Sequence, residues 1–491
     1  MYQRPSNRIL VTLGVCAAAS PVFAEAQTDV ERRLDKLERD NARLREEVTK
    51  LRGDKEVDWL NARRKEEIKA LITEVLADAD QRASLLADGG VAGHNGQNFF
   101  LASADGTYLM QIGGLVQARY AWNHRGRAPA SDQFDDDENG FELARAKLEI
   151  GGYIGSPKIY YVVRIGVDRE DNEVLGERVI LGYEISRDLS IFAGEDKAPF
   201  MREELIDPAR QLAVDRSLFN EFFTAGYVQG AFLRWEMNES LTFFGSINDG
   251  FRSGEADNEF NSSHVFAPSI GVGDIPGRGA GPVAKPFFLD RTDIAMTARL
   301  EWKVMGEWSQ AADFSSASNE GQALFLGGAV HYELGETGSS ALNDNFLAWT
   351  FDAQYENAGF NLAGAVAGFH TDLQQANQFD FFGAMIQGGF MLIPDKLEPF
   401  ARFEWIDLDG HHASGARNDI YIVTAGFNYY IRRHHSKVTV DVMYSPNEMP
   451  NSSFLGLQDN DGTGQALGSI GLREDADGNQ FVLRAQFQLL F

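Results

Sequence analysis

The chain has 491 residues, a formal net charge of −27 and a single cysteine. This acidity excludes a nucleic-acid partner, because affinity for a phosphate backbone needs clustered Lys and Arg. Glycine (49) and phenylalanine (35) are abundant, proline (14) is scarce, and only 44% of the residues are hydrophobic. This composition excludes a bundle of membrane-spanning helices and favours many strands that carry aromatic anchors.

Residues 1–24 have the pattern of a secretory signal. Arg4 and Arg8 give a basic start, residues 9–19 form an apolar run, and residues 22–24 resemble a signal-peptidase site. The run is shorter than the roughly 20 apolar residues that a membrane anchor needs. We therefore predict a cleaved signal peptide over 1–24. It contains Cys16, so the mature chain has no thiol for a disulfide or a metal site, and we predict no cofactor.

A heptad pattern follows the signal. Apolar residues recur at steps of four and three, with one polar break at Asn41, namely Val30, Leu34, Leu37, Leu44, Val48 and Leu51. A second helical pattern covers about 55–86. We predict a helical segment over 25–88 that self-associates as a short coiled coil, with a lone charged helix as the alternative. The glycine-rich stretch 89–106 is predicted to be a flexible linker.

After residue 107 the apolar period changes to two. Met110, Ile112 and Val116 alternate with Gln111 and Gln117, so one face suits lipid and the other suits water. Most of the segments of this kind have the length of a tilted strand that crosses a bilayer. We count sixteen, near 107–122, 140–154, 158–170, 177–186, 188–197, 225–237, 239–249, 291–303, 322–335, 345–357, 358–370, 379–393, 396–409, 417–432, 435–446 and 479–491.

The gaps between these segments alternate between short and long, as in outer-membrane barrels. Only 304–321 breaks the rule, because a short turn is expected there. A soluble β-sandwich is the alternative, but its strands average about 5–6 residues. It also leaves unexplained the tryptophans near segment ends, Trp122, Trp235, Trp302 and Trp349. We predict a sixteen-stranded antiparallel transmembrane β-barrel over 107–491, in the outer membrane of a Gram-negative bacterium, with the coiled coil in the periplasm.

Three short motifs resemble the phosphate-selective porin family (the O and P type). Residues 141–151 (Phe-Glu-Leu-Ala-Arg-Ala-Lys-Leu-Glu-Ile-Gly) are similar to the "F-x-x-R-R-A-R" run of its second strand. Residues 194–200 (Gly-Glu-Asp-Lys-Ala-Pro-Phe) are similar to the "G-x-x-K-x-P-F" that begins its long third loop, and Asp215-Arg216-Ser217 is similar to the "E-R-S" that follows. The terminal Phe491 matches the C-terminal aromatic residue of outer-membrane proteins.

The resemblance implies a homotrimer whose third loop, here 198–224, folds into the lumen as a constriction. It also implies lysines at that constriction and an arginine ladder along the wall in the members that select anions. The candidate pore-wall cations are Arg119, Arg145, Lys147, Arg164, Arg299, Lys303, Arg402 and Arg484. The candidate constriction residues are Lys197, Arg202, Arg210, Arg216, Glu203 and Asp215.

This sequence departs from the family pattern because carboxylates share the inward faces, for example Glu149, Asp352 and Glu404, and the first long loop is acidic (132–138). Basic rings select anions and carboxylate rings select cations. The sequence therefore leaves the selectivity open. Arg145 and Arg164 are the strongest wall candidates, because each lies mid-strand on the inward face. The alternative for each wall arginine is a solvated residue that balances a neighbouring carboxylate.

We predict a water-filled channel for passive diffusion of small charged or polar solutes, with anions such as phosphate among the candidates. Its partners would be membrane lipid, other copies of the chain and the solutes. One rival is an enzyme in which a histidine acts as a base, although none of the candidates has a Ser or Asp partner at a recognisable spacing: His264, His331, His370, His411 and His412. The other rival is a structural tether whose coiled coil binds the cell wall or a periplasmic partner.

Overall fold

The computed structural model describes one part of the chain, residues 90–96, 98–126, 136–167, 174–251, 292–335, 345–372, 379–408, 419–447, 449, 470–473 and 478–491. The chain divides into two compact units, 1–55 and 56–491, and all of the described residues belong to the second. The predicted signal peptide (1–24) and coiled coil (25–88) lie outside the described residues. The same holds for most of the acidic first loop and for His264, His411 and His412.

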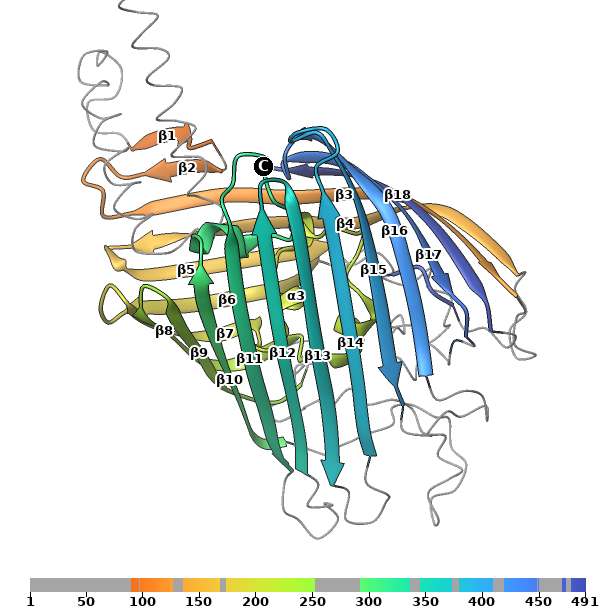
Figure 1. The fold of residues 1–491 in the computed structure, drawn as a ribbon. Coiled ribbons are helices and arrows are strands. Elements are labelled where there is room, and N and C mark those ends of the chain that lie inside the picture. The colour runs from red at the N-terminus through yellow and green to blue at the C-terminus, as the bar shows by residue number, and fades with distance from the viewer. Residues whose placement is uncertain are drawn as a thin grey trace, which may run out of the picture. The chain divides into compact units, whose positions relative to one another are not determined.

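Sixteen long antiparallel strands form one closed barrel (Figure 1). Each strand from β3 to β17 pairs with the next along the chain, and β18 pairs back with β3. The strands are β3 (Leu109–Arg125), β4 (Asp137–Ile154), β5 (Ser156–Val167), β6 (Val174–Glu184), β7 (Leu189–Lys197), β8 (Tyr227–Asn238), β9 (Leu241–Asn248), β10 (Thr292–Met305), β11 (Ala323–Gly335), β12 (Asn345–Asn357), β13 (Phe360–Asp372), β14 (Phe379–Phe390), β15 (Leu397–Asp407), β16 (Asp419–Arg432), β17 (Ser436–Ser445) and β18 (Gln480–Leu490). The predicted fold class and strand number are confirmed.

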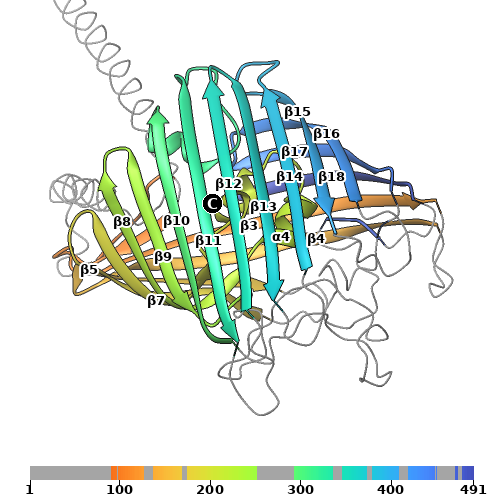
Figure 2. The same cartoon turned by 60° about the horizontal axis from the view of Figure 1, so that its bottom comes forward.

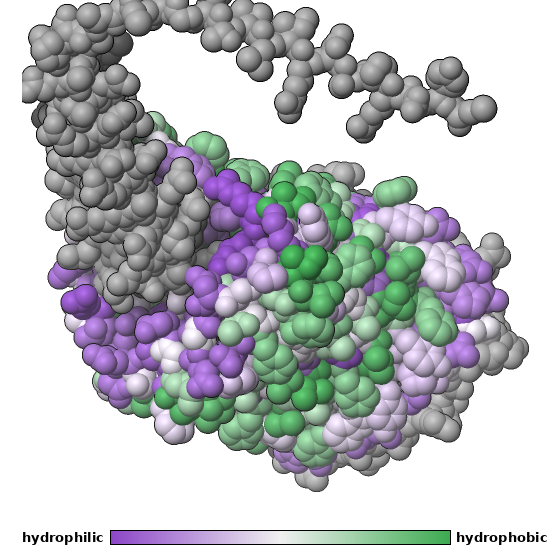
Figure 3. Space-filling view, turned by 45° about the horizontal axis from the view of Figure 1, so that its top comes forward, coloured by the Kyte–Doolittle hydropathy of each residue, from purple (hydrophilic) through white to green (hydrophobic). Residues whose placement is uncertain are grey.

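Burial alternates along these strands because successive side chains point to opposite faces. In β3, Gln117 and Arg119 are buried in the lumen, whereas Val116 and Ala118 are exposed on the outer face. The same alternation leaves an apolar outer surface (Figure 3), to which Leu300, Trp302 and Phe427 contribute. Among the described residues, no helix has the length and apolar character of a membrane span. The strands therefore present apolar side chains outward and keep their polar side chains inside.

The gap that broke the predicted pattern is a long turn that we call the crossbar (residues 306–322), between β10 and β11. It contains the 3-10 helix η4 (Trp308–Ala312), which begins with a reciprocal cap between Glu307 and Gln310. The crossbar contacts other turns at the same end of the barrel: Ala358 N donates to Glu320 O at 3.0 Å, and Ser318 N donates to the Asp395 carboxylate at 3.0 Å. It therefore folds across this end, which we call the short-turn end, instead of simply reversing the chain.

A short hairpin precedes the barrel, where the sequence predicted only a linker. It consists of β1 (Val91–His94) and β2 (Phe99–Ala102), and β2 pairs with the first residues of β3. From Leu115 onward, β3 pairs with β18 instead. The chain end closes this junction, because Phe491 and Gly114 exchange two backbone hydrogen bonds of 2.7 and 2.9 Å. A Cβ atom on Gly114 would lie 2.6 Å from the Phe491 ring, so only glycine leaves room for it.

Candidate functional site

The segment between β7 and β8 lies inside the barrel, and we call it the constriction loop (198–226). It contains α3 (Arg202–Leu205), η1 (Pro208–Arg210) and α4 (Leu218–Phe223). Side-chain caps begin two of these helices, since Asp207 accepts from Ala209 N and Ser217 accepts from Asn220 N, each at 2.9 Å. Most of the loop is buried. The sequence therefore folds this loop into compact turns that fit within the lumen.

Polar side chains from distant strands hold the backbone of the constriction loop. Lys437 on β17 donates to Gln211 O at 2.7 Å, and Gln488 on β18 donates to Ala209 O at 3.0 Å. Asn428 on β16 donates to Leu212 O at 2.9 Å. These strands lie far around the barrel from β7 and β8 (Figure 2). The loop therefore crosses the lumen and is anchored on the far wall.

Asp215 is the electrostatic centre of the constriction loop. Its two carboxylate oxygens accept from Arg145 at 2.7 Å and from Arg119 at 3.1 Å. Burial by itself raises the pKa of the Asp215 carboxyl, but the two guanidiniums outweigh it and hold that pKa well below its usual range. Asp215 is therefore charged at neutral pH and joins the loop to β3 and β4.

Arg402 and Arg484 also bind the constriction loop or a wall residue that holds it, and they have almost no contact with water in the lumen. Arg402 donates to Asp215 O at 3.0 Å and to the next carbonyl at 3.3 Å. Arg484 makes a two-pronged pair with Asp441 at 2.8 and 2.7 Å, and Asp441 accepts in turn from Val214 N at 2.9 Å. Both guanidiniums are almost fully buried. They act as anchors between the loop and the wall.

Arg299 anchors the start of the loop by a bridge that crosses a strand. Its guanidinium binds both oxygens of Asp352 at 2.8 and 2.9 Å and donates to Phe200 O at 2.8 Å. Arg299 lies on β10 and Asp352 on β12, so the bridge passes over β11 between them. It passes at Gly327, where a Cβ atom would collide with both side chains.

Within the loop, Glu204 receives Lys197 at 2.9 Å and Arg216 at 3.3 Å. Burial by itself raises the pKa of the Glu204 carboxyl, but the attraction of these two cations is the larger effect and lowers that pKa to about 2. Glu203 accepts from Ser217 N at 2.9 Å and pairs with Arg402. The predicted constriction residues Lys197 and Arg216 are therefore paired within the loop, whereas Glu203 is paired with an arginine of the wall.

The crossbar supports the loop at the short-turn end. Arg202 donates to Ala311 O at 2.9 Å, and the carbonyl oxygen of Arg210 accepts from Phe314 N at 3.4 Å. Lys303 places its ammonium 5.6 Å from the centre of the Trp308 ring, within range of a cation–π contact. These three predicted cations therefore lie where the loop or the wall meets the crossbar.

A different group of charges lines one wall, and we call it the lumen strip: Arg145, Lys147, Arg164 and Arg178 on β4–β6 with their carboxylate partners. Lys147 pairs with Glu177 at 2.6 Å and Arg164 with Glu149 at 2.6 Å. Arg178, which the sequence analysis missed, pairs with Asp196 at 2.9 Å. A bulge between β5 and β6 interrupts the alternation there. Unlike the anchors, these cations are partly exposed.

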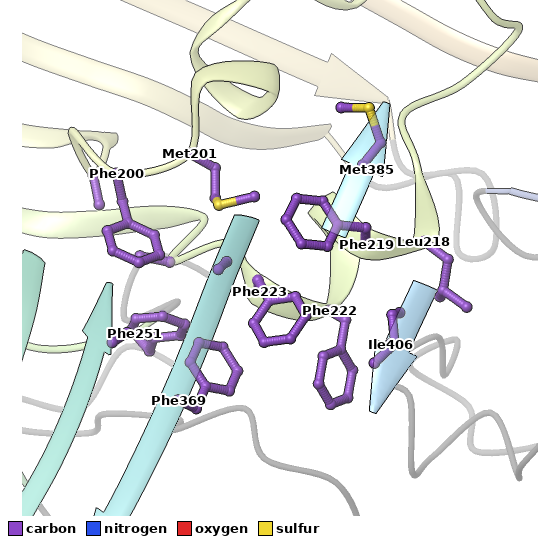
Figure 4. Close-up of a cluster of buried hydrophobic side chains, with 14 of the residues drawn as sticks. Phe200, Met201, Leu218, Phe219, Phe222, Phe223, Phe251, Phe369, Met385 and Ile406 are labelled. Carbon is purple, nitrogen blue, oxygen red and sulfur yellow. The ribbon is translucent and has the colours of Figure 1, made fainter. Parts of the chain in front are cut away.

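A buried apolar cluster packs around α4 (Figure 4), and it extends from β11–β18 across to Val162 on β5 and Ile180 on β6. Phe222 and Phe223 of α4 contact Phe369 and Phe381 of β13 and β14, with the Phe223–Phe369 ring centres 4.8 Å apart. A Cβ atom on Gly383 would lie 2.5 Å from Phe223, so glycine makes room for α4. This cluster was not among the features predicted from the sequence. The signal was available, because apolar residues occupy inward positions at the long-loop ends of β12–β16 and three phenylalanines lie within 219–223.

Two constellations bear on the enzyme hypothesis. Thr297, His331 and Glu333 form a hydrogen-bonded line with contacts of 2.8 Å, but all three side chains are buried, and Glu333 also holds Phe251 N at 2.6 Å. Ser315 contacts His434 through the nitrogen that faces Asp313, so no relay through both ring nitrogens exists there. Both groups brace the barrel interior.

The family model for phosphate-selective porin O and P matches residues 116–453. Similar solved structures include an anion-selective porin from Comamonas acidovorans (11% identity, 78% of this chain and 99% of that chain, TM-score 0.49). They also include the outer-membrane channel DcaP of Acinetobacter baumannii (9%, 79% and 99%, TM-score 0.47) and the trimer form of OmpT from Vibrio cholerae (11%, 77% and 99%, TM-score 0.45). No match was found among curated proteins. Since the matched residues span most of a closed barrel of sixteen strands, this chain belongs to the phosphate-selective porin O and P family and is an outer-membrane channel.

Proposed function

We propose that this channel passes small hydrophilic solutes by passive diffusion with weak charge selectivity, and that it does not select phosphate. The observation that carries the proposal is the pairing within the lumen strip. Each of its four cations has a carboxylate within 2.9 Å. Rings of one charge sign make a filter selective for ions of the opposite sign. Here each cation that borders the water is already paired with a carboxylate.

A phosphate ion entering the strip competes with carboxylates that are held in place. To bind Arg164, for example, it must displace Glu149 at 2.6 Å, while Asp207 lies 3.5 Å from the same guanidinium. Charge-assisted pairs of this kind are among the stronger hydrogen bonds in proteins. The alternating charges instead create a field across the strip, which orients dipolar solutes without trapping either sign.

The test is the reversal potential of the purified protein in a planar bilayer under a KCl gradient, repeated with added phosphate. We expect a small potential and no block of the chloride current by phosphate. A large potential of anion-selective sign, together with phosphate block, would overturn the proposal and assign the strip as an anion-binding ladder. Absence of channels from correctly folded protein would overturn the diffusion function itself.

We further propose the assembly and domain arrangement that the family implies: a homotrimer, with the helical segment 25–88 as an appendage in the periplasm and residues 1–24 removed on export. Family membership supports the trimer. The tether hypothesis draws on residues outside the described part of the chain. Deletion of 25–88, followed by the mass of the assembly in detergent and its conductance, separates the possibilities. Loss of trimers would make the segment an assembly device, and unchanged trimers and conductance would leave a tether role.

A further inference from the structure

We infer that solutes cross this barrel along one wall, the lumen strip on β4–β6, because protein fills the rest of the lumen cross-section. The inference rests on the proposed diffusion function and specifies its route. It follows from three fillings at successive heights of the barrel, which contact mainly β11–β18, and from the distribution of exposed charge. The constriction loop also reaches the strip, where its Asp215 and Asp207 pair with Arg145 and Arg164.

The first filling is the crossbar at the short-turn end. It is tied to the β12–β13 turn through Glu320, to the β14–β15 turn through Asp395, and to the β16–β17 turn through His434. Gln354, which points inward from β12, donates to Asp313 O at 2.7 Å. The crossbar therefore covers the β12–β17 side of this opening.

The second filling is the constriction loop at mid-height. Its α4 helix packs into the apolar cluster against β13, β14 and β15, with Phe219, Phe222 and Phe223 almost fully buried (Figure 4). Close packing of aromatic rings leaves little room for water, because apolar interiors contain few voids as large as a water molecule. Polar anchors from β15–β18 seal the next part of the wall. Side chains of the loop and of the wall therefore occupy this side of the lumen.

The third filling lies on the long-loop side of the constriction. Residues 470–472, from the last long loop, fold inward: Arg484 donates to Ile470 O at 2.7 Å, and Asn123 donates to Gly471 O at 2.8 Å. Ile470 and Leu472 are buried in the same apolar cluster, together with Met449. This loop therefore extends the filled region toward β18 and β3.

Exposure of the ionised side chains shows which side remains open. The side chains of Arg145, Lys147, Arg164 and Arg178 are 14–23% exposed. Those of Arg119, Arg299, Arg402 and Arg484 are 0–1% exposed. All eight lie on inward faces, so the difference reports access to water within the lumen. The exposed inward cations are therefore those of the strip, together with Arg234 on the nearby strand β8, whose side chain is 33% exposed. The four buried arginines are positioning residues that hold the loop.

Cysteine accessibility tests this route directly, because Cys16 is the only cysteine of the chain. In a Cys16→Ser background, Lys147→Cys and Glu177→Cys place a thiol on the strip. Thr350→Cys and Thr424→Cys place one on inward, fully buried positions of β12 and β16, with little change in side-chain volume. A charged methanethiosulfonate reagent is then added to open channels in a bilayer, and labelling of the folded protein is followed by mass spectrometry.

We expect rapid labelling at residues 147 and 177 with about a twofold loss of conductance, because the adduct occupies a narrow passage. Labelling at residues 350 and 424 should be slow and leave the conductance unchanged. Equal labelling and equal block at all four positions, or block only at the threonine positions, would overturn the one-sided route while leaving the diffusion function intact. Failure of the unlabelled background protein to conduct would overturn the diffusion function, and the route with it.

Discussion

At the scale of single residues, buried ion pairs in the barrel interior hold the constriction loop to the wall. The Arg299–Asp352 bridge spans two strands that are not neighbours, which is possible only because Gly327 between them has no side chain. The bridge holds Phe200 O, where the constriction loop begins. A buried pair of this kind stabilises one arrangement of the chain, since removing either partner leaves an uncompensated charge.

Gly327→Ala should therefore destabilise the protein by about 1–3 kcal/mol through overpacking, and should loosen the start of the loop. Melting of the folded barrel and noise in single-channel currents would measure both effects. Gly140→Ala is the matched control, because the added methyl group would meet no atom within 4 Å. Equal stability in the two variants would show that the bridge tolerates a side chain at the crossing.

Asp215→Asn should have two effects, because the carboxylate holds both Arg119 and Arg145. Loss of the buried charge should destabilise the protein by roughly 3–5 kcal/mol, and the partly exposed Arg145 should shift the reversal potential toward anion selectivity. Adding Arg145→Gln should return that potential to near its starting value. A potential unmoved by the first substitution would contradict the placement of Arg145 on the solute path.

The same carboxylate gives a pH dependence of known sign. Because the folded-state pKa of Asp215 lies below its usual value, its contribution to stability is complete above about pH 4 and is lost as the pH falls below that. Denaturation of the parent protein between pH 7 and pH 2 should therefore show a larger fall in stability at the acid end than Asp215→Asn, which keeps the contributions of other carboxylates such as Glu204. Parallel curves for both proteins would remove Asp215 from the acid-sensitive set.

At the scale of elements, the strands and the constriction loop differ in what determines them. Alternation is a local property of the sequence, so all sixteen strands could be predicted to within three residues at each end. The seat of α4 is not local, since Phe223 packs on Phe369 from a strand far along the chain. The hairpin β1–β2 is too short to show a period, and a bulge hides the inward position of Arg178.

The α4 helix has six residues, too few to be stable alone, so its apolar seat must supply its stability. Phe223→Ala should destabilise the folded protein by about 3–5 kcal/mol and raise single-channel conductance as the loop loosens. Phe360→Ala, on the exposed outer face, is the control. It should change neither the stability of the protein in detergent nor its single-channel conductance in a bilayer. A conductance that stays constant in the Phe223 variant would show that the polar anchors alone position the loop.

At the scale of the whole molecule, a strongly acidic chain encloses a passage in which the charges balance. Family resemblance predicted a basic ladder, and the residue types are present, but only the folded barrel shows that each cation of the lumen strip faces a carboxylate. Selectivity therefore depends on pairing between strands, which composition does not reveal. The role of the crossbar was equally hidden in the sequence. Its length showed that this turn is unusual, but its position across the opening depends on contacts among four turns at one end of the barrel.

Replacing residues 307–320 with a two-residue turn should leave the barrel closed, because most of its other turns at this end are short. Without the crossbar, the opening should widen and single-channel conductance should rise. Heat-dependent migration in detergent gels would report folding, and bilayer recordings would report the pore. An unchanged conductance would contradict the idea that the crossbar covers part of the opening.

The seam between β3 and β18 has a consequence for how this protein folds. It brings together Gln117 and Gln488, which are 371 residues apart, and contact order this high slows folding because a long chain must close before the contact forms. The constriction loop depends on the same late event, since β17 and β18 supply Lys437 and Gln488 to its carbonyls. We therefore expect closure of the wall and ordering of the loop to share one slow kinetic phase, so that an incompletely assembled barrel is also one without its constriction.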